Sequence, residues 1–346
     1  MFRHARHAAL ALCLVALAPL SARADPIEDF YRNKTIDLVI GYTPGGTYDL
    51  YARLVSRFLG DFIPGKPRIV PRNMPGGGSR VAASYVYKVG AKDGTVIGSA
   101  EQSLSVEQAM GDKTLGFDID KFQYIGSPIQ ENNTLVTWYT SGVKTIEDAR
   151  QRETPIGATG GSTSSQYPKA MNALLGTKFR IVEGYPGGND ISLAMEKGEV
   201  AGRGSNAWGA WKATHADWLR DGKLNILVQI GLKKAADLPD VPLLMDLART
   251  EDDRAVLKLL STSGSIGRPL FVSPAVPAER VKALRDAFDA MVKSQAFLDA
   301  AAAQKFDILP VGGEELQRIV AGVVATPKPV ADRLNEIIGG IEKNTR

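Results

Sequence analysis

The sequence predicts an α/β protein built of two lobes, and three observations lead to this fold class. Strand-like apolar runs alternate with segments of helical periodicity along most of the chain. Glycine-rich loops separate several of these strands from the helices that follow them. The same order of strand, loop and helix begins again in the middle third, without a low-complexity linker. The alternation indicates a parallel sheet covered by helices on both faces, and the restart indicates two lobes joined by crossover strands that act as a hinge.

The first third supplies two strand-loop-helix units and a third strand. The run T-I-D-L-V-I is rich in β-branched residues, and a glycine-rich turn and a periodic apolar segment follow it. We expect strands at residues 35–40, 68–70 and 95–99, and helices at residues 48–59 and 81–89.

The middle third repeats this order, and the last third is mostly helical. We expect strands at residues 135–138, 155–157, 179–182 and around 200, and helices at residues 145–150, 167–175 and 191–197. The run at 224–230 is expected to form a strand that returns to the first lobe, followed by helices at residues 278–292, 316–324 and 330–341. The predicted domains are therefore a first lobe of residues 25–128 plus 229–346, which carries the C-terminal helices, and a second lobe of residues 129–228.

The N-terminal residues have the pattern of a secretory leader. Arg3 and Arg6 precede an apolar run at residues 8–20, and Ala22 and Ala24 supply the small residues that signal peptidase requires. The apolar run is too short for a permanent membrane span, which takes about 20 residues. We expect residues 1–24 to be a cleaved signal peptide, so that the protein is exported.

Composition excludes several classes of function. The single cysteine, Cys13, lies in the leader, and His215 is the one histidine beyond it. Structural disulfides, thiolate metal sites and histidine-rich zinc sites are therefore not expected. Removing the three leader arginines from 42 Lys and Arg leaves 39, against 38 Asp and Glu. Nucleic-acid binding is not expected, because no Lys/Arg cluster remains. We expect no metal, no cofactor and no catalytic residues.

The first glycine-rich loop has the features of an anion site. Backbone amides at the start of a helix, together with its positive dipole end, attract negative groups. In open α/β sheets, ligands bind at the carboxyl ends of the strands, where this loop is placed. Its candidate ligand-binding residues are Tyr42, Gly45, Gly46, Thr47 and Asp49. For Asp49 a second interpretation stays open, because an acid in the first turn stabilises a helix and Arg53 stands four residues on.

Two further loops resemble the first in position. Gly161, Ser162, Thr163 and Ser164 form a hydroxyl-rich helix start. One hydroxyl caps the helix, and the others are available to bind an anion. The third loop contributes Tyr185 and Gly187, and Asn206 follows another expected strand. Tyr185 has a core-packing alternative, because aromatic side chains pack more often than they bind ligands.

Several motifs resemble those of the Bug or TctC family, the extracytoplasmic solute receptors of tripartite tricarboxylate transporters. They stand in the family's order over nearly the whole chain after the leader: G-Y-T-P-G-G-T-Y-D-L-Y-A-R at 41–53, N-M-P-G-G-G at 73–78, D-G-T at 93–95, the hydroxyl loop, Y-P-G at 185–187, G-E-V at 198–200 and L-P-D-V-P at 238–242. The resemblance implies a periplasmic binding protein of type II-like, Venus-flytrap fold.

This resemblance also implies a function. Receptors of this family bind mono-, di- and tricarboxylates, acidic amino acids and aromatic acids, and they deliver them to the permease subunits of the transporter. We expect the same here, in a monomer. Gln166 and Pro186 replace a histidine and a basic residue that the family often has, which favours a mono- or dicarboxylate over a citrate-like trianion.

Two alternatives stay open. The closing lobes would serve equally in a ligand-sensing receptor for a periplasmic signalling kinase. A hydrolase that uses one of Ser162 to Ser165 is the other alternative, although the sequence offers no credible base to activate the serine.

Overall fold

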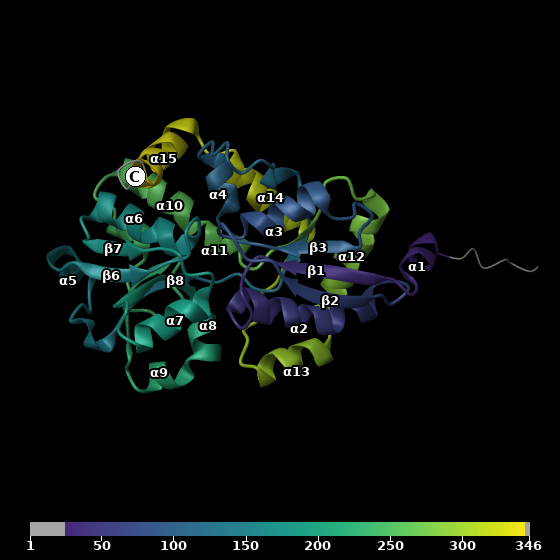
Figure 1. Cartoon of the computed structure of the whole chain (residues 1–346), viewed down its shortest axis with the longest axis horizontal. Coiled ribbons are helices and arrows are strands. Elements are labelled where there is room, and N and C mark those ends of the chain that lie inside the picture. The colour runs from purple at the N-terminus through teal and green to yellow at the C-terminus, as the bar shows by residue number, and fades with distance from the viewer. Residues whose placement is uncertain (1–24, 343–346) are drawn as a thin grey trace, which may run out of the picture.

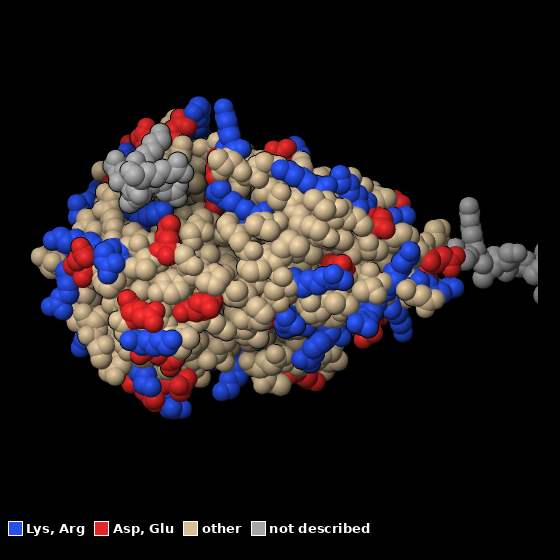
Figure 2. All heavy atoms as spheres, in the orientation of Figure 1, with Lys and Arg blue, Asp and Glu red and all other residues tan. Residues whose placement is uncertain are grey.

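The computed structural model describes residues 25–342, and the expected leader lies outside the described residues. Two β-sheets, each flanked by helices, form two lobes side by side along the long axis (Figure 1). On the face shown in Figure 2, charged side chains of both signs are scattered over both lobes, and the band where the lobes meet is largely uncharged.

The first lobe contains a six-stranded sheet in the order β11-β4-β10-β3-β1-β2. Its strands are β1 (Thr35–Ile40), β2 (Arg68–Asn73), β3 (Val96–Ser99), β4 (Gln123–Ser127), β10 (Leu270–Val272) and β11 (Val311–Gly312). Only β1, β2 and β3 pair in parallel, whereas β10 runs antiparallel to β3 and β4, and β11 antiparallel to β4. The expectation of a parallel sheet is wrong for the part of the sheet formed by β4, β10 and β11. The reason is that the chain leaves the lobe after β4 and comes back in the opposite direction along β10.

Both faces of this sheet are buried under helices. The elements are α1 (Pro26–Tyr31), α2 (Thr47–Phe62), α3 (Arg80–Ser84), a π-helical turn η1 (Tyr85–Val89), α4 (Leu104–Ala109), a short 3₁₀ turn η2 (Ile119–Lys121), α12 (Ala278–Met291), α13 (Gln295–Ala303) and α14 (Gly313–Val324). One core lies among β1, α2, α12 and α13, and a second lies among α3, α4 and α14. In α2, Tyr51, Leu54, Val55 and Leu59 recur at helical spacing and are buried, each stabilising the fold by about 1.5–3 kcal/mol. This burial holds the start of α2 against the end of β1.

The second lobe contains a five-stranded sheet in the order β7-β6-β8-β5-β9. Its strands are β5 (Asn133–Trp138), β6 (Thr154–Gly157), β7 (Phe179–Val182), β8 (Gly202–Ala207) and β9 (Leu224–Ile230). Strand β9 has the expected bounds but does not return to the first lobe, since it pairs antiparallel with β5 from Leu224 to Ile230. The helical turns before β9 reverse the chain, which places the strand beside β5.

Helices of the second lobe include three α-helices from the C-terminal third. The elements are η3 (Tyr139–Ser141), α5 (Ile146–Gln151), α6 (Thr163–Leu175), α7 (Gly188–Glu196), α8 (Trp208–Thr214), α9 (Ala216–Arg220), η4 (Leu244–Leu247), α10 (Glu251–Ser261), α11 (Ser263–Ile266) and α15 (Lys328–Glu342). We expected residues 229–346 in the first lobe. Instead, Leu260 of α10 and Leu334 of α15 share a core with Met171 of α6, because the apolar stripes of α10 and α15 match the outer face of α6.

The chain therefore crosses between the lobes three times. The crossings lie between β4 and β5, between α11 and β10, and between α14 and α15. In Figure 1, α15 lies at the top of the second lobe near α6 and α10, whereas α14 lies in the first lobe. Three adjacent connections make a hinge, and they leave the loops after β1, β3 and β6 facing each other across the interface.

Candidate ligand-binding site between the lobes

A small cavity of about 50 Å³ lies between the lobes. The first lobe lines it with the loop after β1, the residues after β3 and the arginine two residues before β10. The second lobe lines it with the start of α6, the end of β8 and the start of α7. The lining residues are Tyr42, Gly46, Thr47, Tyr48, Glu101, Gln102, Asn133, Thr159, Ser162, Thr163, Ser164, Gly188, Ile191, Arg203, Ser205, Asn206, Ala207 and Arg268.

The loop after β1 brings the start of α2 to this cavity. No side chain caps the helix at Gly46, and Gly46, Thr47 and Tyr48 all line the cavity. The first amides of α2 and the positive end of its dipole are therefore directed at the space between the lobes. Of the residues predicted in this loop, the structure places Tyr42, Gly46 and Thr47 at the cavity.

Asp49 and Gly45 are not among the lining residues. The Asp49 carboxylate accepts hydrogen bonds from the Gly45 amide at 2.9 Å, from Arg53 Nε at 2.9 Å and from Asn73 Nδ2 at 2.7 Å. Burial alone would raise the pKa of Asp49, but these hydrogen bonds hold it below its ordinary value. The structural interpretation of Asp49 is the one that the geometry supports, since the side chain braces the loop from behind.

The start of α6 uses most of its hydroxyls internally. Ser162 caps the helix by accepting the Ser164 N–H at 3.2 Å, and it donates to the Thr159 carbonyl at 2.8 Å. Ser164 Oγ accepts the Thr159 N–H at 2.9 Å. Ser162, Thr163 and Ser164 line the cavity, but the two serines are engaged in the loop itself. Fewer hydroxyls are therefore available to bind an anion than the sequence predicts.

Thr163 has a different partner from its neighbours. Its hydroxyl reaches across the interface and donates to Glu101 Oε1 at 3.3 Å. The hydroxyl of Tyr42 donates to the other oxygen of Glu101. Glu101 is 4% exposed, and burial raises its pKa. Sequence reasoning did not identify this acid, which stands just after β3.

The remaining predicted residues divide between two places. Asn206 lines the cavity from the end of β8. Gly161 and Tyr185 line a separate, larger groove. Gly187 lies where the lobes touch, since a Cβ built on it would be 2.1 Å from Thr43 Oγ1. Gly188, one residue further on, is the residue of this loop that reaches the cavity.

Arg268 is a cavity residue that sequence reasoning missed. It is 3% exposed and its guanidinium lies over the Tyr48 ring, 4.4 Å from the centroid. One terminal nitrogen donates to the Gly267 carbonyl at 3.3 Å and the other lies 3.8 Å from Glu131. Its buried Nε has no hydrogen-bond partner among residues 25–342. An orphaned buried N–H of this kind is costly unless a ligand or water satisfies it.

Arg203 on β8 is the second missed cation. Its Nη1 donates to the Gly188 carbonyl at 3.3 Å, and the guanidinium lies 5.4 Å from the centroid of the Trp211 ring. Its Nε likewise lacks a partner within the described part of the chain. Burial and the charge of Arg268 lower the pKa of Arg203 to about 10. The group is still charged at neutral pH, and an anion in the cavity would stabilise it.

One signal in the sequence could have revealed both arginines. Arg203 is the one charged residue between Glu199 and Lys212, and Arg268 is the one charged residue between Lys258 and Glu279. A single arginine in a long uncharged segment has no charged neighbours in the sequence. The structure buries Arg268 and half-buries Arg203.

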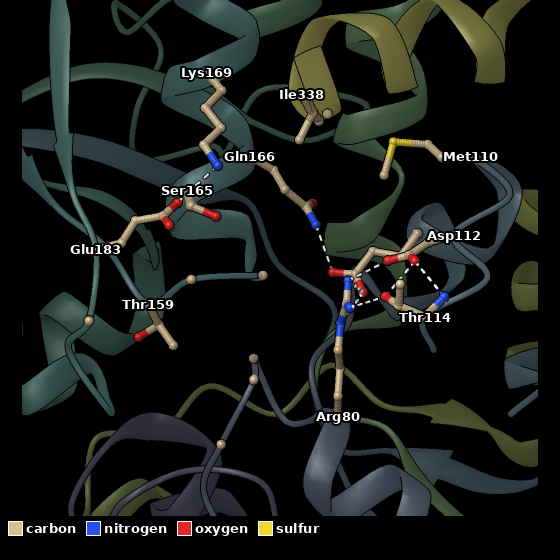
Figure 3. Close-up of a pocket in the computed structure, with 18 of the residues that line it drawn as sticks. Arg80, Met110, Asp112, Thr114, Thr159, Ser165, Gln166, Lys169, Glu183 and Ile338 are labelled. Atoms are coloured by element: carbon tan, nitrogen blue, oxygen red, sulfur yellow. Dashed lines mark hydrogen bonds and ion pairs between the residues drawn. The ribbon is translucent and has the colours of Figure 1, made fainter. Parts of the chain in front are cut away.

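The larger groove, of about 910 Å³, lies beside the cavity at the edge of the interface (Figure 3). Gln166 of α6 crosses it and donates to Glu107 Oε1 of α4 at 2.9 Å. Arg80 binds both Glu107, at 3.0 Å, and Asp112, at 2.6 Å. Gln166 and Pro186 line this groove and not the cavity. The absence of a charge on these two residues therefore affects the groove and does not determine the charge of the cavity.

The lobes are closed on one another. Besides the contacts of Thr163 and Gln166, Thr43 Oγ1 donates to Asp190 Oδ2 at 3.4 Å. A Cβ built on Gly78 would lie 2.3 Å from the Gly161 carbonyl oxygen. Such a close approach of two backbones permits only glycine at this position.

Residues 25–342 hold no cluster of His, Cys, Asp and Glu side chains able to bind a metal. Among the same residues, each helix is too short or too polar to cross a bilayer.

Comparison with known proteins supports the resemblance seen in the motifs. No family model matches the chain. It is 25% identical over 336 residues to the UPF0065 protein in gbd 5'region of Cupriavidus necator, covering 94% of each chain. Among solved structures, it is similar to the periplasmic binding protein BugD, with a TM-score of 0.70 and 17% identity over 89% of this chain and 99% of BugD.

A second solved structure, R. palustris Rpa4515 with adipate, has a TM-score of 0.67 and 21% identity over 88% of this chain and 97% of that one. These likenesses confirm the expected two-lobed fold of periplasmic binding proteins and the resemblance to the Bug family. BugD is described as a periplasmic binding protein, and the R. palustris protein was solved with adipate.

Proposed function

We propose that this protein is a periplasmic solute-binding protein that captures a small carboxylate between its lobes and delivers it to the permease subunits of a tripartite tricarboxylate transporter. One observation carries the binding proposal. Two arginines, Arg203 and Arg268, line a small cavity between the lobes, and each has a buried Nε–H without a partner in the described chain. A carboxylate is the planar acceptor that guanidinium groups bind best.

The surroundings of the arginines suit capture better than catalysis. The hydroxyls of Ser162 and Ser164 are tied to Thr159 and to each other. His215 hydrogen-bonds Thr214 and packs on Trp218, and it does not line the cavity. No described residue is therefore placed to activate one of these serines as a nucleophile.

Other support comes from the similar proteins. BugD is a periplasmic binding protein, and the R. palustris protein holds adipate, a carboxylate. Export to the periplasm is supported by the leader pattern of residues 1–24. Delivery to a permease is supported by the motif resemblance to the receptors of these transporters.

A thermal-shift screen against mono-, di- and tricarboxylates tests the binding proposal. A ligand at 100 times its Kd stabilises the folded protein by about 2.7 kcal/mol. Arg203→Met should weaken the best ligand about 30-fold or more, because it removes a buried partner of the carboxylate. Arg180→Met is the matched control, since Arg180 is an exposed arginine of the same lobe. Equal loss of affinity in both variants, or no loss in Arg203→Met, would contradict the site.

Delivery needs a separate test. Transport of the identified ligand in membrane vesicles that contain the permease should require the liganded protein. Recovery of a signalling kinase and no permease, when the liganded protein is used to capture membrane partners, would overturn the transport proposal and leave the binding proposal standing.

A further inference from the structure

We infer that the cavity selects a carboxylate with a single negative charge, and that Glu101 is the residue that excludes a second carboxylate. This inference rests on the proposed function and names the class of ligand within it. Its basis is the balance of charge around the cavity, where two arginines face a buried acid.

Glu101 is built into the wall of the site. It stands two residues after β3, lines the cavity and is 4% exposed. Tyr42 donates a hydrogen bond to one of its oxygens and Thr163 donates to the other at 3.3 Å. Hydroxyl donors on both oxygens stabilise the ionised carboxylate. They also occupy these oxygens, so Glu101 acts on a ligand through its charge more than as a hydrogen-bond acceptor.

The charge of Arg268 is already matched by acids. Glu131 lies 3.8 Å from one terminal nitrogen, and Glu131 and Glu101 both raise the pKa of Arg268, although burial opposes them. The Tyr48 ring covers the guanidinium. A ligand that meets Arg268 therefore finds directed N–H donors but little uncompensated positive charge.

Arg203 is the cation that lacks an acid. Within residues 25–342 it makes no ion pair with any carboxylate within 4.0 Å, whereas Arg268 does. Its other near neighbours are the Gly188 carbonyl and the Trp211 ring. With both acids ionised, the charges of Arg203, Arg268, Glu101 and Glu131 sum to zero. Arg203 is then the one cation of this group without a direct ion pair, and it can pair with one carboxylate of a ligand.

A second carboxylate would be unfavourable in this space. The cavity is only about 50 Å³ in volume and is lined mostly by buried residues, so both charged groups of a short dicarboxylate would lie near Glu101. Like charges repel strongly where little water screens them, and a buried carboxylate without a cation is costly. A monocarboxylate instead places its one charge between the arginines.

Pairs of ligands with equal carbon number test the inference: butyrate with succinate, hexanoate with adipate, and benzoate with phthalate. For the pair that binds, calorimetric titration of the wild-type protein should show at least tenfold tighter binding of the monocarboxylate. Glu101→Gln keeps the shape of the side chain and removes its charge. It should reduce the ratio of the dicarboxylate Kd to the monocarboxylate Kd at least tenfold. Glu196→Gln, at an exposed glutamate of α7, should leave it unchanged.

A measurement on the wild-type protein keeps the test independent of how well the variant folds. Glu101 faces Tyr42, Tyr48, Tyr167, Glu107, Arg203 and Arg268. Glu107 lies outside the cavity and already carries its proton at neutral pH, because burial raises its pKa to about 8. Glu101 is therefore the acid of the cavity that can take up a proton to admit a dianion. Dicarboxylate affinity should therefore fall about tenfold per pH unit above neutrality, with proton uptake visible in buffers of different ionisation enthalpy. Monocarboxylate affinity should stay level.

The outcomes separate the two proposals. If a dicarboxylate binds as tightly as its monocarboxylate partner at pH 8 without proton uptake, the role of Glu101 is overturned and carboxylate capture stands. If the thermal-shift screen finds only ligands with two or more carboxylates, this inference is overturned and carboxylate capture stands. If it finds no carboxylate ligand, the proposed function fails together with this inference.

Discussion

Gln166 of α6 and Glu107 of α4 join the two lobes through a hydrogen bond of 2.9 Å from Nε2 to Oε1. Both side chains are buried, at 3% and 2% exposure. The bond exists only while the lobes are closed, and it lies outside the cavity, in the groove beside it (Figure 3). Residues of this kind should affect ligand affinity without touching the ligand, because binding and closure are coupled.

Gln166→Ala should weaken ligand binding roughly tenfold, because a hydrogen bond to a charged or partly charged carboxyl contributes about 1.5 kcal/mol to the closed state. Calorimetric titration measures the change. Gln151→Ala, at an exposed glutamine of the same lobe, is the control. An affinity equal to that of the wild type would show that this bond does not favour closure.

Glu107 should make stability depend on pH. Burial raises its pKa to about 8, although Arg80 lowers it. The folded state then keeps a proton that the unfolded chain loses above about pH 4.5. The associated stability is fully present below pH 4.5 and is lost as pH rises toward 8, by at most about 1.4 kcal/mol per pH unit.

Glu107→Gln should therefore flatten the profile of unfolding free energy between pH 5 and pH 8, as chemical denaturation would show. Glu196→Gln, at an exposed glutamate, should leave the profile as it is. A wild-type profile that already rises through this range would mean that Glu107 is ionised against Arg80 throughout.

Gly78→Ala should block closure. Gly78 has a φ of +61°, and a Cβ there would lie 2.3 Å from the Gly161 carbonyl oxygen of the other lobe. Gly222→Ala is a matched control, because Gly222 has a φ of +64° and open space around the Cβ position. Both substitutions introduce the same backbone strain of about 1 kcal/mol. Only Gly78→Ala should lower ligand affinity, by at least tenfold. Similar ligand affinities in the two variants would mean that the lobes close without this backbone contact.

Asp49→Ala should lower stability more than it lowers affinity. It removes the carboxylate that holds the Gly45 amide, Arg53 and Asn73 together, at a cost of about 2–3 kcal/mol. Asp61→Ala, at an exposed position near the end of the same helix, is the control. If the Asp49→Ala variant keeps the wild-type melting temperature but does not bind ligand, Asp49 contacts the ligand and its role is not structural.

Local patterns predicted much of the fold. The T-I-D-L-V-I run forms β1 at the expected residues, and the apolar spacing after it forms α2. The same local chemistry placed Gly46, Thr47 and Ser162 to Ser164 at helix starts, and these residues do line the cavity. Such features depend on neighbours within a few residues, so a sequence contains the information that specifies them.

The neighbours of each element were less predictable. The 224–230 run was recognised as a strand, but its sheet was not, since its apolar residues would have suited either lobe. Helix α15 was likewise expected, whereas its packing on α6 depends on where Met171 and Leu175 present a surface. Whether an apolar element packs on one lobe or the other depends on how well its surface fits the surface that it meets. The order of residues along the chain does not show this fit.

By itself the sequence determined that this is a two-lobed α/β chain whose glycine-rich loops stand between strands and helices. The tertiary structure decided which loop residues meet at the cavity, and it assigned Asp49 to the support of its loop. It alone brought Arg203, Arg268 and Glu101 together from positions up to 167 residues apart. The reason is physical: a charged residue has no periodicity and is solvated by default, so only the packing of distant elements reveals that it is buried and facing another charge.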